Sequence, residues 1–253
     1  MVEIAEAQIL AWITPVLWPF LRTLAMFTAL PVLGTRTVPA RVRVALSALV
    51  ALASQASLPP MPVVPLDSPL AFLLVVQQVV IGLCVGFAVR VVFAAVEFAG
   101  ELVGLQMGLN FAGFFDPATA STSTALSRFY GTMVAWLFVV INGHLLVLAA
   151  LLQSFETFPV GPEPMGFLRA TLPHQWGAEI FMTGLWIAVP MVAMLLFVNL
   201  VLGVISRVAA QINIFAVGFP ITVSVGLIGT LVTLPLLQTP FTMALERLLV
   251  VFR

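Results

Sequence analysis

Long apolar stretches recur along this chain, and they constrain its fold more than any other feature of the sequence. The longest uncharged stretch, Val208 to Leu245, contains no Asp, Glu, Lys or Arg. A helix needs about 20 predominantly apolar residues to cross a bilayer, and stretches of about that length occur several times. Hydrophobic residues make up 62% of the 253 residues and charged residues only 8%, which is too few to cover a soluble domain. The sequence therefore predicts an integral membrane protein.

About six apolar segments are expected to form helices, which predicts an all-α fold class. A Pro-rich stretch, Leu58 to Pro69, is expected to be a loop because proline lacks the amide donor of a helix. A second, polar loop is expected at about Glu156 to Gly177. We find no internal repeat and no low-complexity linker, and therefore expect one domain over residues 1–253. The six segments are Ala7–Leu30, Val42–Leu58, Pro69–Gly108, Arg128–Phe155, Ala178–Ser206 and Val208–Leu245.

The third segment is too long for a single membrane crossing. Its roughly 40 residues give about 60 Å of helix, which is about twice the hydrocarbon thickness. Arg90, Glu97 and Glu101 lie on one face, close to glycines at spacings of four that let a neighbouring helix approach. Two interpretations stay open: this face lines a pore or subunit interface, or it lies in solvent beyond the lipid. The glycines are Gly82, Gly86, Gly100, Gly104 and Gly108.

The last segment contains too many prolines for one straight helix. Pro220, Pro235 and Pro240 interrupt it, and each removes a helical backbone hydrogen bond. We expect a broken helix or a helical hairpin there, followed by a short amphipathic tail from Thr242 to Arg253.

Catalytic and metal-binding motifs are missing from the sequence. The two histidines, His144 and His174, are far apart, and the single cysteine, Cys84, lies in an apolar run. Glu97 and Glu101 have no histidine three or four residues away, as the dimetal pattern of helix bundles requires. The sequence has no lysine and no nucleophile-elbow, zinc-protease or P-loop motif. We therefore expect no enzyme activity, no cofactor and no metal, and zero net charge argues against nucleic-acid binding.

The loop after the third segment combines flexible backbone with bulky apolar side chains. It runs Gly104-Leu-Gln-Met-Gly-Leu-Asn-Phe-Ala-Gly-Phe-Phe-Asp-Pro117. Its glycines loosen the backbone, methionine and three phenylalanines supply adaptable bulk, and Asp-Pro starts a turn. Such a segment suits a hydrophobic constriction that excludes water. The alternative is an ordinary connector whose phenylalanines are buried.

A small-solute secondary transporter is the second function that we consider. Its substrate site would use polar residues of the broken helices near the membrane midplane, here Asn142, His144, Asn199 and Asn213. Transporters of this kind have internal pseudo-symmetry, and we find none between the halves of this sequence. Purification tests this alternative. A transporter should purify alone or as a symmetric homo-oligomer, whereas a subunit of a larger pore assembly should co-purify with unlike subunits in a fixed unequal ratio.

Several ordered motifs together carry a family resemblance. They are Trp18-Pro19 with Arg22; Arg36, Pro39, Arg41 and Arg43; Glu101-Leu-Val-Gly-Leu-Gln-Met-Gly108; Phe111; Asp116-Pro117; Asn142-Gly143-His144; Ser154-Phe155 with Pro159 and Gly161; and Asn213-Ile-Phe-Ala-Val-Gly-Phe-Pro220 with Gly226. These motifs, spread over essentially the whole chain, resemble the FliR family of flagellar export-gate proteins. That family is related to the SctT components of virulence type III secretion systems.

The resemblance implies a core pore subunit of the flagellar type III protein export apparatus, in the bacterial inner membrane at the flagellar basal body. It implies a FliP-like part over about residues 1–206 and a FliQ-like hairpin over about 207–253. One such subunit would assemble with five FliP and four FliQ copies and contact FlhB. Unfolded flagellar export substrates would pass through the assembly.

The resemblance also implies that the third segment is a long kinked helix and that the loop after it, Gly104 to about Ser121, plugs the pore. The plug residues are then Gly104, Gln106, Met107, Gly108, Phe111, Phe114, Phe115, Asp116 and Pro117. We expect helix packing or subunit contacts at a second set of residues. These are Gly82, Gly86, Arg90, Glu97, Gly100, Glu101, Asn142, His144, Asn213, Phe215, Gly218 and Pro220.

Overall fold

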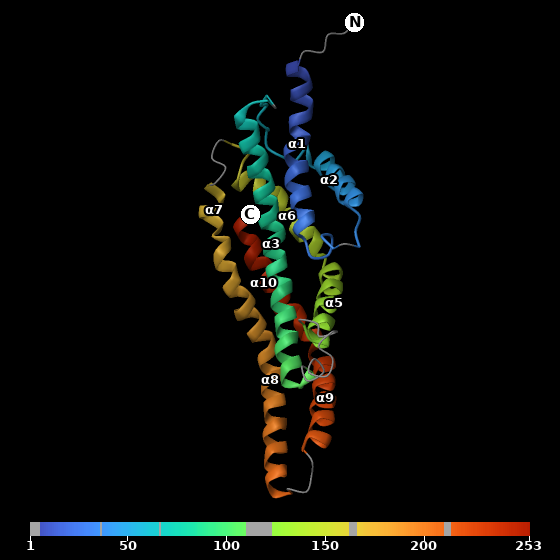
Figure 1. Cartoon of the computed structure of the whole chain (residues 1–253). Helices are drawn as coiled ribbons and strands as arrows, with labels where there is room; N and C mark the ends of the chain where they lie inside the picture. The colour runs from blue at the N-terminus through green and yellow to red at the C-terminus, as the bar shows by residue number, and fades with distance from the viewer. Residues whose placement is uncertain (1–5, 36, 66, 110–122, 162–165, 210–213) are drawn as a thin grey trace. The chain divides into compact units, whose positions relative to one another are not determined.

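The computed structural model describes residues 6–35, 37–65, 67–109, 123–161, 166–209 and 214–253. Every regular element within these ranges is a helix, which confirms the all-α fold class (Figure 1). The α-helices are α1 (Glu6–Ala29), α2 (Ala40–Ser54), α3 (Pro69–Gln106), α5 (Ala125–Val140), α6 (Gly143–Thr157), α7 (Gly166–Thr171), α8 (Trp176–Val208), α9 (Ile214–Thr233) and α10 (Gln238–Leu249). Short 3₁₀ turns are η2 (Pro173–Gln175), η3 (Leu234–Leu237) and η4 (Val250–Phe252).

Three helical stretches in the described part of the chain are long and apolar enough to cross a membrane. They are Pro69–Gln106, Gly166–Val208 and Ala216–Phe252. The number rises to four if α5 and α6 are counted as one broken span. The chain is therefore built as a membrane protein, while the count of about six apolar helical segments stays a prediction.

The long third segment forms one helix, as expected. α3 contains 38 residues, which corresponds to about 57 Å. At its start, the Ser68 hydroxyl accepts a hydrogen bond from the Ala71 amide at 3.1 Å. Beyond its end, Gly108 adopts a φ of 79°, a left-handed conformation that favours glycine.

The chain folds as two compact units. The first comprises Met1–Val91, Phe138–Trp176 and Leu245–Arg253, and the second comprises Val92–Leu137 and Gly177–Ala244. α3 contributes residues to both units. The division into a FliP-like and a FliQ-like part near residue 206 stays a prediction.

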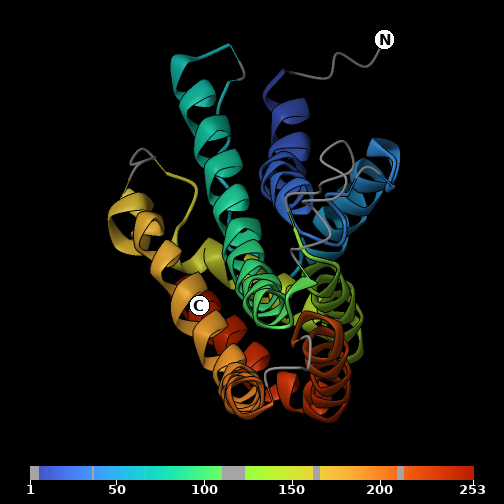
Figure 2. The ribbon, with the colours of Figure 1, turned by 60° about the horizontal axis from the view of Figure 1, so that its bottom comes forward.

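In the first unit, α1 and α2 lie side by side (Figures 1 and 2). α2 buries only small side chains, Ser47, Ala51 and Ser54, and small residues let two helices approach closely. A hydrophobic cluster forms around the fully buried Trp18 and Leu74 of α3. The Trp18 indole N–H donates to the carbonyl of Pro62 at 3.3 Å, so α1 also holds the Pro-rich loop.

An aromatic cluster fixes the C-terminal turn within the same unit. The ring of Phe252 packs edge-on against Phe158 and Trp176, with centroid distances of 6.4 and 6.0 Å. Trp176 also stacks on Phe87 of α3 at 6.0 Å. Phe252 is completely buried as a result, which shows that the end of the described chain belongs to the core of this unit.

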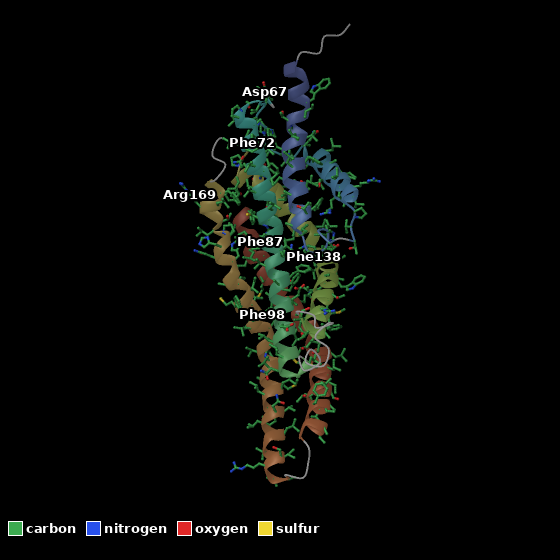
Figure 3. The ribbon with its side chains drawn as sticks, viewed as in Figure 1. Asp67, Phe72, Phe87, Phe98, Phe138 and Arg169 are labelled. Atoms are coloured by element: carbon green, nitrogen blue, oxygen red, sulfur yellow. The ribbon has the colours of Figure 1, made fainter. Side chains whose placement is uncertain are left out.

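In the second unit, α8 and α9 run side by side (Figures 1 and 2). They are antiparallel, and Gly229 of α9 lies against Met191 of α8. The C-terminal part of α3 carries Phe98 (Figure 3). The ring of Phe98 packs against that of Phe181 on α8, with the centroids 5.3 Å apart. The second unit therefore surrounds the end of α3 with helices on more than one side.

The fourth segment differs from our expectation. We expected one helix from Arg128 to Phe155, and this is wrong, because the chain breaks between α5 and α6. Asn142 adopts a left-handed conformation with a φ of 57°, which a helix interior does not accept. Asparagine tolerates that conformation better than most residues, so the Asn-Gly pair separates two helices inside a continuous apolar run. The polar loop that follows also contains α7 and η2.

The last segment is a broken helix, which was one of our two expectations. η3, which contains Pro235, interrupts it between α9 and α10. Pro220 lies inside α9. The chain does not turn back at this interruption, because Ala216–Phe252 forms one helical stretch. The other expectation, a helical hairpin within this segment, is not what the structure has: the antiparallel pair is formed by α8 and α9.

Candidate functional site

A carboxylate on α3 holds the start of α5. Glu101 Oε2 accepts hydrogen bonds from the Thr124 amide at 2.9 Å and from Thr124 Oγ1 at 3.0 Å. Thr124 Oγ1 in turn accepts from the Ser127 amide at 3.1 Å, and Ser127 Oγ donates to the Glu97 carbonyl at 2.9 Å. Helix starts favour a hydroxyl cap and a nearby carboxylate, because their first N–H groups are unpaired. We call Glu97, Glu101, Thr124 and Ser127 the Glu101 clamp.

Two glycines of α3 make room for the clamp. A Cβ atom on Gly104 would lie 2.7 Å from Thr124 Oγ1, and one on Gly100 would lie 3.0 Å from Ser127 Cα. Both distances are shorter than ordinary van der Waals contact, so a larger residue would push α5 away from α3. These two glycines of the predicted stripe therefore pack within this chain.

The segment between α3 and α5 has a described stem at each end, and the Glu101 clamp holds the stem that leads into α5. The stem that follows α3 is held by α9. Met107 directly follows α3 and is only 1% exposed. Its side chain lies against Gly226, where an added Cβ would be within 2.7 Å of Met107 Cγ, Sδ and Cε. Thr222 Oγ1 donates to the Met107 carbonyl at 3.5 Å. We call Met107, Thr222 and Gly226 the Met107 seat.

The loop between α3 and α5 is thus anchored at both ends within the second unit. Of the predicted plug residues, Gly104 and Met107 are buried, whereas Gln106 and Gly108 are half-buried. The remaining predicted plug residues, Phe111, Phe114, Phe115, Asp116 and Pro117, lie outside the described residues. The structure therefore describes the candidate site at its two ends, the Met107 seat and the Glu101 clamp.

Comparisons with known proteins agree on one family. The family described as "Bacterial export proteins, family 1" matches residues 13–248. The chain is 41% identical over 241 residues to "Flagellar biosynthetic protein FliR" of Escherichia coli strain K12, covering 95% of this chain and 92% of that protein. The chain belongs to the FliR family. FliR of Pectobacterium carotovorum is 39% identical (91% and 87% covered) and FliR of Bacillus subtilis strain 168 is 30% identical (84% and 83% covered).

Membership of the FliR family makes this chain a component of the flagellar protein export apparatus. Its apolar helices agree with a membrane protein. The relatives cover most of the chain, so the family applies to both compact units.

Further predicted contact residues of the FliR-family chain lie along α3. Gly82 and Gly86 pack against α1, where added Cβ atoms would collide with Ala25 and Ala29. Arg90 and Glu97 are exposed on the same helix. The predicted glycine stripe thus contacts helices of this chain, and exposed charges remain at the middle of α3.

The other predicted contact residues lie on separate helices. His144 and Pro220 are exposed, Asn142 forms the break before α6, and Gly218 is buried. Asn213 and the side chain of Phe215 lie outside what the structure describes. Asn199, a candidate for a transporter site, is exposed on α8. In the described ranges, no group of three or more His, Cys, Asp or Glu side chains is placed to hold a metal ion.

The sequence analysis of this FliR-family chain included Arg22 in a family motif but missed the buried polar cluster that Arg22 forms. Arg22 of α1 is completely buried. Its Nε donates to Gln78 Oε1 at 2.8 Å, its Nη1 to the carbonyl and Oγ of Ser154 at 2.8 and 2.9 Å, and its Nη2 to the Phe158 carbonyl at 3.0 Å. The guanidinium also lies over the Phe155 ring, 3.7 Å from the centroid. A single side chain thereby joins α1, α3 and α6.

A pair of glutamines extends this cluster to the loop after α6. Gln78 Nε2 donates to Gln77 Oε1 at 3.0 Å, and Gln77 Nε2 donates to the Pro159 carbonyl at 3.4 Å. The Gly161 amide donates back to Gln77 Oε1 at 3.4 Å. A signal was present in the sequence: one arginine and two adjacent glutamines inside apolar helices need polar partners, because unpaired buried polar groups are costly.

Proposed function

We propose that this FliR-family chain is a core pore subunit of the flagellar export apparatus, forming a gated channel with FliP-like and FliQ-like subunits. Unfolded flagellar proteins would pass through this channel in the inner membrane at the basal body. The observation that carries the proposal is the glycine-rich loop whose stems are fixed by the Glu101 clamp and the Met107 seat. Fixed stems on both sides would let the segment between them return to the same place, as a reversible plug must.

The chemistry of the loop supports a role as a barrier. Phe111, Phe114 and Phe115 supply apolar bulk, and the adjoining glycines leave the backbone free to move. Hydrophobic constrictions close a pore by excluding water, and ions are excluded with it. A plug of this kind would retain ions between export events.

Exposed apolar faces support contacts with partner subunits. Large hydrophobic side chains on α8 and α9 are roughly half or more exposed, and the segment from 208 to 245 carries no charge. An apolar hollow of about 390 Å³ opens beside them, lined in part by Trp186, Pro190 and Leu236. The exposed residues are Phe181, Met182, Leu185, Trp186, Val189, Leu196, Phe197, Leu200, Leu227, Ile228, Leu231 and Val232. Large exposed apolar patches usually mark protein or membrane contacts.

We extend the proposal to the composition of the assembly. Residues 1–206 would take a FliP-like place and residues 207–253 a FliQ-like place, with one copy of this chain beside five FliP and four FliQ subunits. FlhB would contact the same assembly. Co-expression with the FliP-like and FliQ-like chains of the same genome tests this, and the expected result is one complex with a fixed unequal ratio. A symmetric homo-oligomer of this chain alone would contradict it.

The plug role is tested by ion conductance of the assembled complex. Because Met107 and Thr124 belong to the anchored stems, residues 111–121 are replaced by a Gly-Ser linker of equal length. We expect normal assembly and increased ion leakage. A matched variant with Phe111, Phe114 and Phe115 changed to leucine keeps the apolar bulk and should stay tight. An assembled linker variant with wild-type conductance would refute the plug role.

A further inference from the structure

The helix α2 carries an apolar stripe on the side that faces away from α1. At about 100° per residue, Val42, Leu46 and Leu49 fall on one stripe, and Leu52 lies beside it. These four side chains are between 37% and 64% exposed. The buried side chains of α2 are small and lie on the other side of the helix, next to α1 (Figures 1 and 2). α2 therefore presents its large apolar side chains outward.

α2 is too short to cross a bilayer. Its 15 residues give about 22 Å of helix, whereas the hydrocarbon core is about 30 Å thick. A short helix with one apolar side and arginines at the edge of that side is typical of helices that lie along the membrane surface. The length of α2 thus favours a position at the interface between acyl chains and headgroups.

Two arginines flank the start of the apolar stripe. Arg41 and Arg43 directly precede and follow Val42, so they point about 100° to either side of it. Between Glu6 and Asp67 the sequence has four arginines and no acidic residue. The edges of the stripe are therefore positively charged, and this charge is complementary to an anionic surface.

Arg43 has a donor without an acceptor in the described part of the chain. Its Nε atom is shielded from water and has no hydrogen-bond partner among the described residues. A shielded donor without a partner is unfavourable, and Arg43 as a whole is only half-buried. A small outward movement of its guanidinium toward a phosphate oxygen would remove this cost, and arginine binds phosphate through two parallel N–H groups.

We propose that α2 is an interfacial helix that binds anionic phospholipid. The apolar stripe enters the acyl region, and Arg41 and Arg43 extend to the headgroup phosphates, as long basic side chains do at membrane surfaces. A soluble phosphate compound would use the arginines but leave the stripe in water. Positive charge beside apolar side chains reproduces the order of phosphate and acyl chain in a lipid, and the inference does not depend on the proposed plug.

Binding of single lipids tests the role of the arginines. The full chain in micelles is titrated with fluorescent phosphatidylglycerol and, separately, with fluorescent phosphatidylcholine. Arg41→Gln and Arg43→Gln should each lower the affinity for phosphatidylglycerol about fivefold, the effect of one basic residue near an anionic lipid surface, and leave phosphatidylcholine binding unchanged. Arg169→Gln on the exposed surface of α7 is the matched control and should change neither affinity.

Two results of the titration would overturn the proposal. One is an equal affinity for phosphatidylglycerol in the Arg41→Gln and Arg169→Gln chains. The other is full competition by glycerol 3-phosphate, which carries the phosphate without acyl chains and would indicate a site for soluble phosphate. Because Arg41 is exposed, its substitution gives a result even if Arg43→Gln impairs folding.

Spin-label accessibility tests the position of the apolar stripe. Leu49→Cys is labelled with a nitroxide in a Cys84→Ser background, which removes the native thiol. The labelled chain is reconstituted, alone and in the co-expressed complex, in nanodiscs of phosphatidylcholine and phosphatidylglycerol. We expect frequent collisions of the label with oxygen, which partitions into acyl chains, and few with a water-soluble nickel chelate.

The other outcomes of the spin-label experiment contradict the proposal in different ways. Frequent collisions with the nickel chelate would place the stripe in water. Shielding from both reagents in the complex, but not in the chain alone, would show that a partner subunit covers the stripe. If no complex forms, the proposed pore function fails, and the label on the chain alone still reports whether α2 lies in lipid.

Discussion

Arg22 and Phe155 form a buried cation–π pair, with the guanidinium carbon 3.7 Å from the ring centroid. The four hydrogen-bond acceptors around this guanidinium are all neutral: two side-chain oxygens and two carbonyls. A buried charge normally needs a partner, and here an aromatic face and oriented dipoles take that place. The partners come from α3, α6 and the residue after α6, so the charge also determines how these elements meet.

We predict that Arg22→Ala destabilises the first unit by about 3–5 kcal/mol. The change leaves a large cavity and removes the donors for Gln78 and Phe158, and both kinds of defect are among the costly ones. Denaturant unfolding of the purified chain in detergent micelles measures the effect. Arg169→Ala is the control, because Arg169 is exposed on α7 (Figure 3), and its cost should stay within about 0.5 kcal/mol. Equal stability of the two variants would show that the buried cluster contributes little.

We predict an energetic coupling between Glu101 and Thr124. Thr124→Ala should cost about 1 kcal/mol as a lost helix cap, and Glu101→Ala should remove the same hydrogen bonds from the other side. A double-mutant cycle should then give a coupling energy of about 0.5–3 kcal/mol. Thr132→Ala on the exposed surface of α5 is the matched threonine control and should not couple with Glu101→Ala. Strictly additive effects of the first pair would mean that the clamp does not act as a unit.

Sequence reasoning located the long helices because an apolar run is a local property. The expected segments Ala7–Leu30 and Pro69–Gly108 agree with α1 and α3 to within about two residues. The break at Asn142 was missed because hydropathy is continuous across it, and a single left-handed residue decides it. Local patterns carry no information about which distant groups meet, and Arg22 lies 132 positions from Ser154.

The candidate site was predictable in part for the same reason. The loop composition after α3 singled out Gly104 to Pro117, and the glycine spacing singled out Gly100 and Gly104 as close-contact positions. The contact between Gly226 and Met107 depends on the tertiary packing of two segments that lie 119 residues apart in the sequence. Nothing in either segment alone indicates this contact. The motif that includes Asn213 to Pro220 with Gly226 pointed to the right helix but not to its contact.

We predict that the backbone conformation of Asn142 decides the tolerance of that position. Asn142→Ala should destabilise the chain by about 1 kcal/mol, because a left-handed conformation costs most residues about 1–2 kcal/mol. Asn142→Gly should be close to neutral, since glycine adopts positive φ readily. Thermal unfolding of both variants in micelles provides the comparison. Similar losses in the alanine and glycine variants would point to the amide side chain instead of the backbone.

We predict that Phe252 is essential for the stability of the first unit, although it lies in the last turn of the described chain. Phe252→Ala should cost about 3–5 kcal/mol, as for other buried phenylalanines, because the ring fills the space between Phe158 and Trp176. Val250→Ala in the same turn changes a side chain that is 59% exposed and should cost less than about 0.5 kcal/mol. Limited proteolysis should cut the Phe252→Ala chain near its C-terminus faster than the Val250→Ala chain, because the ring contacts with Phe158 and Trp176 that help to hold the turn would be lost. Equal cleavage rates would place the anchor of this turn elsewhere in the unit.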